Sequence, residues 1–189
     1  MQPFAKKYIS LRHKTQTIST NPNIMYKAFK IIIAAMLATA TIGCGGRSEE
    51  QTKASAASLM AVNSGIDSVY NQLQQSYETF SATEMDRALE GFNNYLLQAT
   101  KTIQDTKVGD DCKPLQDAIS SKIGTMYSIA SNEAKEQVRI YKIPDSDFTD
   151  DLRHQWDAIS ATVAKKVSDA NSKVNQAIET INKKSKSGK

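Results

Sequence analysis

A single histidine lies among carboxylates near residue 150, and this arrangement resembles a metal site more than any other in the chain. Asp150 and Asp151 precede His154 by four and three residues. Asp157 follows it by three. On a helix these spacings share one face, where carboxylate and imidazole groups can bind a metal ion. Acids in a first helical turn also stabilise the helix dipole, and we expect this role, with His154 facing solvent.

A di-iron site and a calcium loop are both excluded by the residues that they would need. A di-iron bundle requires two Glu-x-x-His elements, and the chain after residue 43 has one histidine. Asp145, Asp147 and Thr149 follow the spacing that opens an EF-hand loop. Position six of that loop would be Asp150 instead of Gly, and position twelve would be Trp156 instead of Glu.

Cys112 is the remaining candidate nucleophile. The adjacent Asp110 and Asp111 disfavour a thiolate, whereas Lys113 and a helix N-terminus favour one. No histidine lies nearby in the sequence to act as a base, so we expect an unreactive thiol, with an intermolecular disulfide as the alternative. Because the sequence has no nucleophile–base pair, phosphate loop or metal cluster, it predicts a protein that is not an enzyme and needs no cofactor.

A leader typical of exported bacterial proteins occupies residues 25–43. Lys27 and Lys30 form its basic segment, and an uncharged run of twelve residues follows from Ile31 to Ile42. The run has the length of a signal-peptide core. It is shorter than the roughly 20 apolar residues that a membrane-spanning helix needs.

Residues 41–44 (Thr-Ile-Gly-Cys) resemble the lipobox of bacterial lipoproteins. In that family the cysteine is lipidated and the chain is cut just before it, which implies cleavage between Gly43 and Cys44. The family's usual Leu is Thr41 here. The alternatives are ordinary secretion after the Ala-x-Ala site at residues 38–40, and an uncleaved anchor. We expect the mature chain to begin at a lipidated Cys44.

The charge of the chain is uneven. Residues 1–24 are basic, and we interpret them as an over-called start before Met25 or as a long extension of the leader. Six of the 24 basic residues and none of the 20 acidic residues lie in 1–43, so the rest has 18 basic residues and a net charge of −2. A body of this charge offers no global basic field to nucleic acid.

Helical periodicity extends from residue 53 to 182 and predicts an all-α fold. Residues 44–52 lack it and are predicted to be a flexible tether. The first helix is expected at about 53–80, and the second runs from a cap at Ser81 or Thr83 to about 107. The third begins at a cap, Asp110 or Asp111, and ends at the break at Pro144. The fourth is expected from about 145 to 182. Short connections favour an antiparallel up-down-up-down bundle. An elongated, coiled-coil-like variant is the alternative, because the apolar stripes approach a period of 3.5.

Aromatic residues and the C-terminus supply the remaining candidates for binding. Trp156 falls on an apolar stripe, so we expect it in the core. The tyrosines that border the stripes are expected at the edge of the core or around a pocket; these are Tyr70, Tyr95, Tyr127 and Tyr141. Residues 183–189 form a basic tail that we expect to be solvated and flexible, with anionic lipid or envelope polymer as the alternative contact.

The body resembles an uncharacterised family of helical bacterial surface lipoproteins, from about residue 61 to 181. The residues that carry the resemblance are Ala61-Val62 with Gly65-Ile66, Gly109-Asp110-Asp111, Ser128-Ile129-Ala130 with Glu133, Lys135-Glu136 and Pro144. The resemblance implies a protein that is anchored by lipid in the outer membrane, at its surface or periplasmic face, and it implies no activity.

We therefore expect a non-catalytic envelope lipoprotein that acts in interaction or envelope structure, with a protein or an envelope polymer as its partner. The alternative is a periplasmic or surface carrier of a small ligand. A carrier should present a well-formed pocket with a few convergent polar groups.

Overall fold

The computed structural model describes the backbone of residues 49–187 and the side chains of residues 50–183. The leader, the predicted lipidation at Cys44 and the predicted cleavage after Gly43 lie outside the described residues. Within residues 49–187 every regular element is a helix, which confirms the all-α prediction.

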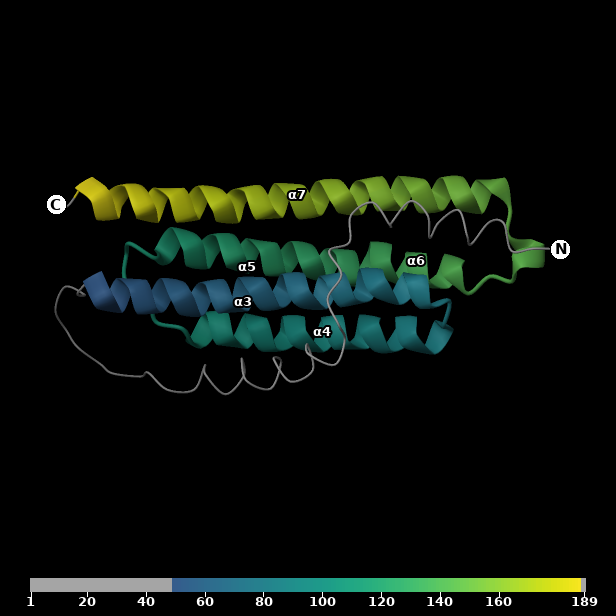
Figure 1. Cartoon of the computed structure of the whole chain (residues 1–189), viewed down its shortest axis with the longest axis horizontal. Coiled ribbons are helices and arrows are strands. Elements are labelled where there is room, and N and C mark those ends of the chain that lie inside the picture. The colour runs from purple at the N-terminus through teal and green to yellow at the C-terminus, as the bar shows by residue number, and fades with distance from the viewer. Residues whose placement is uncertain (1–48, 188–189) are drawn as a thin grey trace.

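The first half of the body is a helical hairpin (Figure 1). Helix α3 (Glu49–Ser76) ends in a short 3-10 turn, η1 (Tyr77–Thr79), and α4 (Ala82–Asp105) returns antiparallel to it. Helix α3 begins at Glu49, earlier than the predicted start near residue 53. Its fully buried apolar stripe begins at Leu59, and in the turns before it Ala56 packs on the core and is partly buried.

The second half forms two further antiparallel rods. Helix α5 (Lys113–Ser128), a π-helix, η2 (Ile129–Ala134), and α6 (Lys135–Tyr141) make one continuous rod. After the 3-10 turn η3 (Asp145–Asp147), α7 (Asp150–Ser187) runs back along it as the longest helix of the described chain. The four rods confirm the predicted antiparallel bundle.

The helix ends agree with the sequence in part. Ser81 caps α4 as predicted, because its Oγ accepts from the backbone N–H of Glu84 at 3.3 Å. Glu84 pairs with Arg87 instead of reaching back, and the backbone N–H of Ser81 donates to Thr79 Oγ1 at 3.3 Å. Ser81 therefore makes one half of a capping box, and Glu84 does not complete the other half.

The predicted caps of the third helix are wrong. Cys112, and neither Asp110 nor Asp111, occupies the position before α5, and no side-chain cap is made there. Pro114 lies in the first turn of α5, where its missing N–H costs least. The break at Pro144 is confirmed, because α6 ends at Tyr141.

The predicted apolar stripes form the core. One cluster of buried side chains joins all four rods and includes Leu59, Ile66, Leu73, Tyr77, Phe92, Leu96, Ile119, Met126, Ile140, Trp156, Val163 and Val174. Phe80, which the α3 stripe also predicts to be buried, is 52% exposed. It is displaced because the chain leaves the α-helix at Ser76 and tightens into η1.

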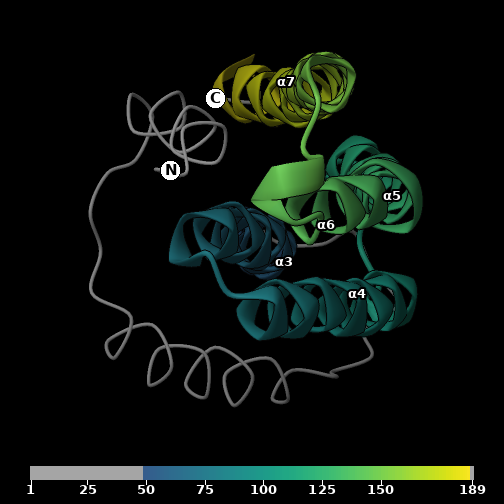
Figure 2. The same cartoon turned by 90° about the vertical axis from the view of Figure 1, so that its right-hand side faces the viewer.

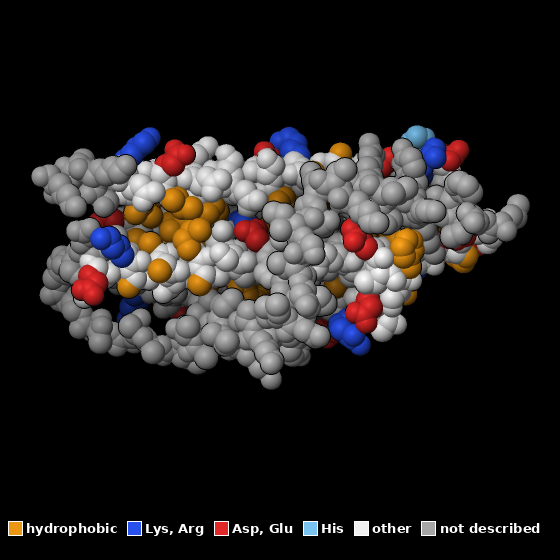
Figure 3. Space-filling view, viewed as in Figure 1, with side chains coloured by type: hydrophobic (Ala, Val, Ile, Leu, Met, Phe, Trp, Pro, Cys, Tyr) orange, Lys and Arg blue, Asp and Glu red, His pale blue; other side chains and the backbone are white. Residues whose placement is uncertain are grey.

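The four rods are not packed symmetrically. Helix α3 packs on α4 and more lightly on α5, whereas α7 packs mainly along α5 and less along η2 and α6. An end-on view shows α7 above the α5–α6 rod, apart from α4 (Figure 2). The edge between α3 and α7 is therefore open towards the C-terminal part of α7, where hydrophobic side chains are visible between the two helices (Figure 3).

Candidate functional site

The residues of the predicted metal site lie on the surface. His154 and Asp151 are exposed, and Asp150 Oδ1 accepts from Arg153 at 3.1 Å. Within residues 50–183, no group of three histidine, cysteine or acidic side chains is arranged to hold a metal ion. The position of Asp150 and Asp151 in the first turn of α7 fits the interpretation as residues that complement the helix dipole.

The Cys112 thiol is enclosed at the start of α5. Its side chain is 1% exposed, and Sγ donates to the backbone carbonyl of Thr52 on α3 at 3.4 Å. A thiol that is this well buried is poorly placed for an external substrate or a second chain. The contact fastens the first turns of α3 to α5, close to the point where the chain comes from Cys44.

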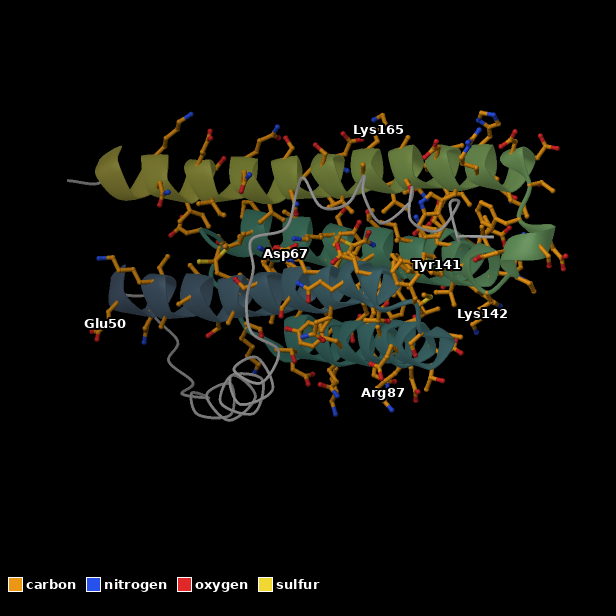
Figure 4. The ribbon with its side chains drawn as sticks, turned by 45° about the vertical axis from the view of Figure 1, so that its right-hand side comes forward. Glu50, Asp67, Arg87, Tyr141, Lys142 and Lys165 are labelled. Atoms are coloured by element: carbon orange, nitrogen blue, oxygen red, sulfur yellow. The ribbon has the colours of Figure 1, made fainter. Side chains whose placement is uncertain are left out.

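A fully buried lysine joins α5 to α3. The Lys122 side chain has no solvent exposure, and its Nζ donates to Asp67 Oδ1 at 2.6 Å and to Asn63 Oδ1 at 2.8 Å. Figure 4 shows Asp67 on the side of α3 that faces α5. Because a buried ammonium group is very unfavourable without partners, this contact fixes the alignment of α5 along α3.

The π-helix η2 carries a second ion pair, which reaches α7. Glu133 Oε1 accepts from Lys166 Nζ, and Lys166 also donates to Ser128 Oγ at 3.3 Å. Glu133 Oε2 is buried and has no hydrogen-bond partner among the described residues. π-Helical turns are often found at functional sites. Here the turn aims Glu133 at α7, where the carboxylate helps to hold that helix.

A third polar contact lies one turn further along, on α6. Gln137 is buried, accepts from the Tyr77 hydroxyl at 3.4 Å and donates to Ser160 Oγ at 3.1 Å. It therefore joins the end of α3 to α7 through α6. Sequence reasoning did not identify Lys122, Glu133 or Gln137.

Aromatic rings fill the end of the bundle that the α3–α4 and α6–α7 turns form. The rings of Tyr77 and Tyr141 are stacked with centroids 6.0 Å apart, and Trp156 lies 5.3 Å from Tyr77 and 5.6 Å from Tyr141. Phe80 lies against Tyr141 from outside, at 6.0 Å. Trp156 is in the core as predicted, whereas Tyr141 is buried deeper than an edge position.

Two surface grooves are the hollows most like a binding site. The smaller, of about 220 Å³, lies between α4 and α5 and is lined by residues that include Thr100, Gln104, Gly124 and Tyr127. The larger, of about 850 Å³, follows the open edge between α3 and α7 and is lined by Tyr70 and by polar residues of α7 such as Asn171 and Asn175. Tyr127 and Tyr70 thus border grooves, whereas Tyr95 is buried.

The basic C-terminus continues the last helix. Helix α7 extends to Ser187, so Lys183, Lys184 and Lys186 belong to its final turns, beyond the end near 182 that the sequence predicted for the bundle. Lysines at a helix C-terminus are favoured by the helix dipole. The Lys183 side chain is exposed.

The buried tyrosines are expected to make the fold sensitive to alkaline pH. Burial raises the pKa of Tyr95 to about 12, and burial with the negative charges of Glu78 and Asp145 raises that of Tyr141 to about 12. Burial also raises the pKa of Tyr77. Unfolded tyrosine ionises near 10, so the stability from the neutral phenols is complete below pH 10 and is lost as the pH rises towards 12.

A titration that records tyrosinate absorbance and helical circular dichroism together tests this expectation. Part of the tyrosinate signal should appear only as the helix signal falls. Complete ionisation near pH 10 in a fully helical protein would show that these phenols are accessible to solvent.

The fold and these contacts define the class of protein. It is a helical bundle with a packed core, buried polar contacts between its helices and open grooves on its surface. Comparison with protein families, with curated proteins and with solved structures finds no match. The resemblance to surface lipoproteins therefore stays a prediction. No helix of residues 49–187 combines the length and the apolar character that crossing a membrane requires.

Proposed function

We propose that the chain is a lipid-anchored protein of the bacterial cell envelope, most consistent with the outer membrane, whose bundle is a non-catalytic interaction module. The lipobox-like residues before Cys44 support the anchor. The interaction role is supported by the surface, because the hollows described above are grooves between helices and the chemistry-bearing residues His154, Asp150 and Asp151 are solvated.

The observation that carries the proposal is the direction in which the bundle extends from the predicted anchor. Helix α3 begins five residues after Cys44 and has 28 residues, so it spans about 40 Å at about 1.5 Å per residue. The end where α3 begins is therefore the end near the anchor. The opposite end, which presents the partly exposed Phe80, is the end most remote from the membrane.

A small-ligand carrier is the second candidate, and the groove between α3 and α7 favours it. The groove has a volume of about 850 Å³, and its lining includes Tyr70, Asn171 and Asn175. A drug-sized ligand needs a cleft of about 300–1,000 Å³ with a few placed polar groups. Its lining is more polar than that of a typical carrier pocket, so interaction with a macromolecule is the leading proposal.

The anchor is tested by comparing Cys44→Ser with Cys112→Ser in bacterial cells. We expect wild type and Cys112→Ser in the membrane fraction, with an intact mass of a chain that begins at a lipidated Cys44. The Cys44→Ser protein should lose the lipid mass and most of its membrane association, because one serine has replaced the acceptor thiol. Protease treatment of intact cells then reports whether the anchored body faces outward.

Cys112→Ser is the matched control, since it removes the other cysteine of the chain and leaves the leader unchanged. A mature wild-type chain that begins at residue 41 without modification would contradict the proposal and favour ordinary secretion. Equal membrane retention of Cys44→Ser with its leader intact would favour the uncleaved anchor.

A further inference from the structure

Phe80 occupies a position whose backbone conformation favours glycine. Its backbone has φ 55° and ψ 23°, in the left-handed region, directly after η1. Within residues 49–187 it is the one residue other than glycine with a positive φ. Left-handed backbone is unfavourable for a residue with a Cβ, and helices that end this way usually carry glycine there. A large apolar ring that is 52% exposed adds a second cost.

The exposed ring is the outermost member of the aromatic cluster at this end of the bundle. It lies against Tyr141, with centroids 6.0 Å apart and planes at 56°. Tyr141 rests on Tyr77 and Trp156, so the cluster continues into the core. The Tyr141 side chain is 3% exposed, and its hydroxyl has no hydrogen-bond partner among the described residues. Figure 4 shows Tyr141 inside this end of the bundle.

Two carboxylates lie near the Tyr141 ring. Glu78 and Asp145 lie close enough to the Tyr141 phenol to act on it electrostatically. Glu78 is half-buried and makes no hydrogen bond or ion pair within the described residues. The nearby cation Lys142 is engaged, since its Nζ donates to both carboxylate oxygens of Asp86 at 2.7 Å.

The exposed Phe80 ring and the Glu78 carboxylate, which both lie close to Tyr141, together favour a cationic partner. The face of an aromatic ring attracts a cation through its quadrupole, and a nearby carboxylate adds charge attraction. An anionic lipid surface or a polyanion would be repelled at this end. An arginine guanidinium suits the site especially well, because it is planar, stacks on rings and pairs with carboxylates.

We propose that this end of the bundle binds an arginine-bearing segment of a partner protein, with Phe80 as the stacking residue and Glu78 as the ion-pair residue. The proposal rests on the proposed interaction function, and it deepens that function by naming the chemistry of the partner. It does not depend on the anchor, so a soluble or an anchored protein would show the same binding.

The test uses the full chain in a neutral detergent and a labelled peptide, acetyl-Gly-Arg-Leu-Arg-Gly-amide, with citrulline in place of arginine as the control peptide. We expect saturable binding of the arginine peptide in fluorescence anisotropy and at least about tenfold weaker binding of the citrulline peptide. Phe80→Gly and Glu78→Gln should each weaken the arginine peptide by about fivefold or more. Leu97→Ala and Glu90→Gln are matched controls, because they change an exposed apolar residue and an exposed acid elsewhere on α4.

The stability of Phe80→Gly separates binding from packing. If the ring serves a partner, the melting temperature should stay the same or rise, because glycine relieves the left-handed backbone while binding is lost. A clear fall in the melting temperature would show that the ring is retained to cover Tyr141, and would overturn the proposal. Equal binding of both peptides, or unchanged binding by Phe80→Gly and Glu78→Gln, would overturn it as well.

Discussion

Replacement of Lys122 by alanine is expected to lower the free energy of unfolding by about 3 kcal/mol, at the lower end of the range for breaking a buried ion pair. The variant removes an ammonium group that is completely enclosed and leaves Asp67 and Asn63 without their shared donor. Asp67 is 39% exposed, so water can solvate part of its charge, and this limits the loss. The Cγ, Cδ and Cε methylenes that the variant removes also leave a cavity between α5 and α3.

Denaturant unfolding followed by circular dichroism measures this effect, with Lys165→Ala as the control. Lys165 also pairs with a carboxylate at 2.6 Å, that of Asp169, but its side chain is 76% exposed. Figure 4 shows it pointing away from the bundle. Its loss should cost no more than about 0.5 kcal/mol. Equal effects of the two substitutions would mean that Lys122 reaches water in solution.

Replacement of Gly65 by alanine is expected to cost about 2–3 kcal/mol, the upper part of the range for overpacking. A Cβ at Gly65 would lie 1.7 Å from the Tyr95 hydroxyl oxygen and 2.3 Å from its ring carbon Cζ. Tyr95 cannot move freely, because it is 7% exposed and donates to the backbone carbonyl of Val62 at 3.3 Å. The substitution therefore forces α3 and α4 apart or expels the ring.

Gly124→Ala is the matched control, and it should change stability in the opposite direction. A Cβ at Gly124 meets nothing within 4 Å, so alanine should stabilise α5 by up to about 1 kcal/mol through helix propensity. Adding Tyr95→Leu to Gly65→Ala should recover part of the loss, because the shorter side chain vacates the space. Similar effects of the two glycine substitutions would show that Tyr95 is mobile.

Periodicity in the sequence was sufficient to predict the rods, because a helix that faces a core must repeat its apolar residues every three or four positions. Leu59, Ile66 and Leu73 follow this rule and are buried. The rule fails at Phe80, where the chain changes from an α-helix to a 3-10 turn and the stripe no longer points inward. Period alone carries no information about such a change of helix type.

The candidate site was harder to predict, because polar residues are ordinarily assigned to the surface. Lys122 lies three residues after Ile119 and four before Met126, so its spacing places it on the buried face of α5. That signal was present and was overlooked. His154 is the reverse case, since carboxylates at helical spacing suggested a ligand set, and the structure places the histidine in solvent. Whether such a polar side chain is buried or solvated depends on the atoms that other helices place beside it. A single sequence does not give the positions of those atoms.

The π-helix has a consequence for how this protein can change in evolution. A π turn holds one more residue than an α-helix of the same length. Before the turn, Lys122 is aimed at α3, and after it Gln137 is aimed at Tyr77 and Ser160. Loss of one residue within Ile129–Ala134 would therefore close the π turn into an ordinary α turn and leave the side chains after it in place. Loss of one residue elsewhere between Lys122 and Gln137 would rotate one of these side chains against the other by about 100°, the angle per residue in a helix of 3.6 residues per turn. The length of this rod is therefore restricted on either side of η2, and changes of one residue will be tolerated in the π turn itself and in the turns that connect the rods.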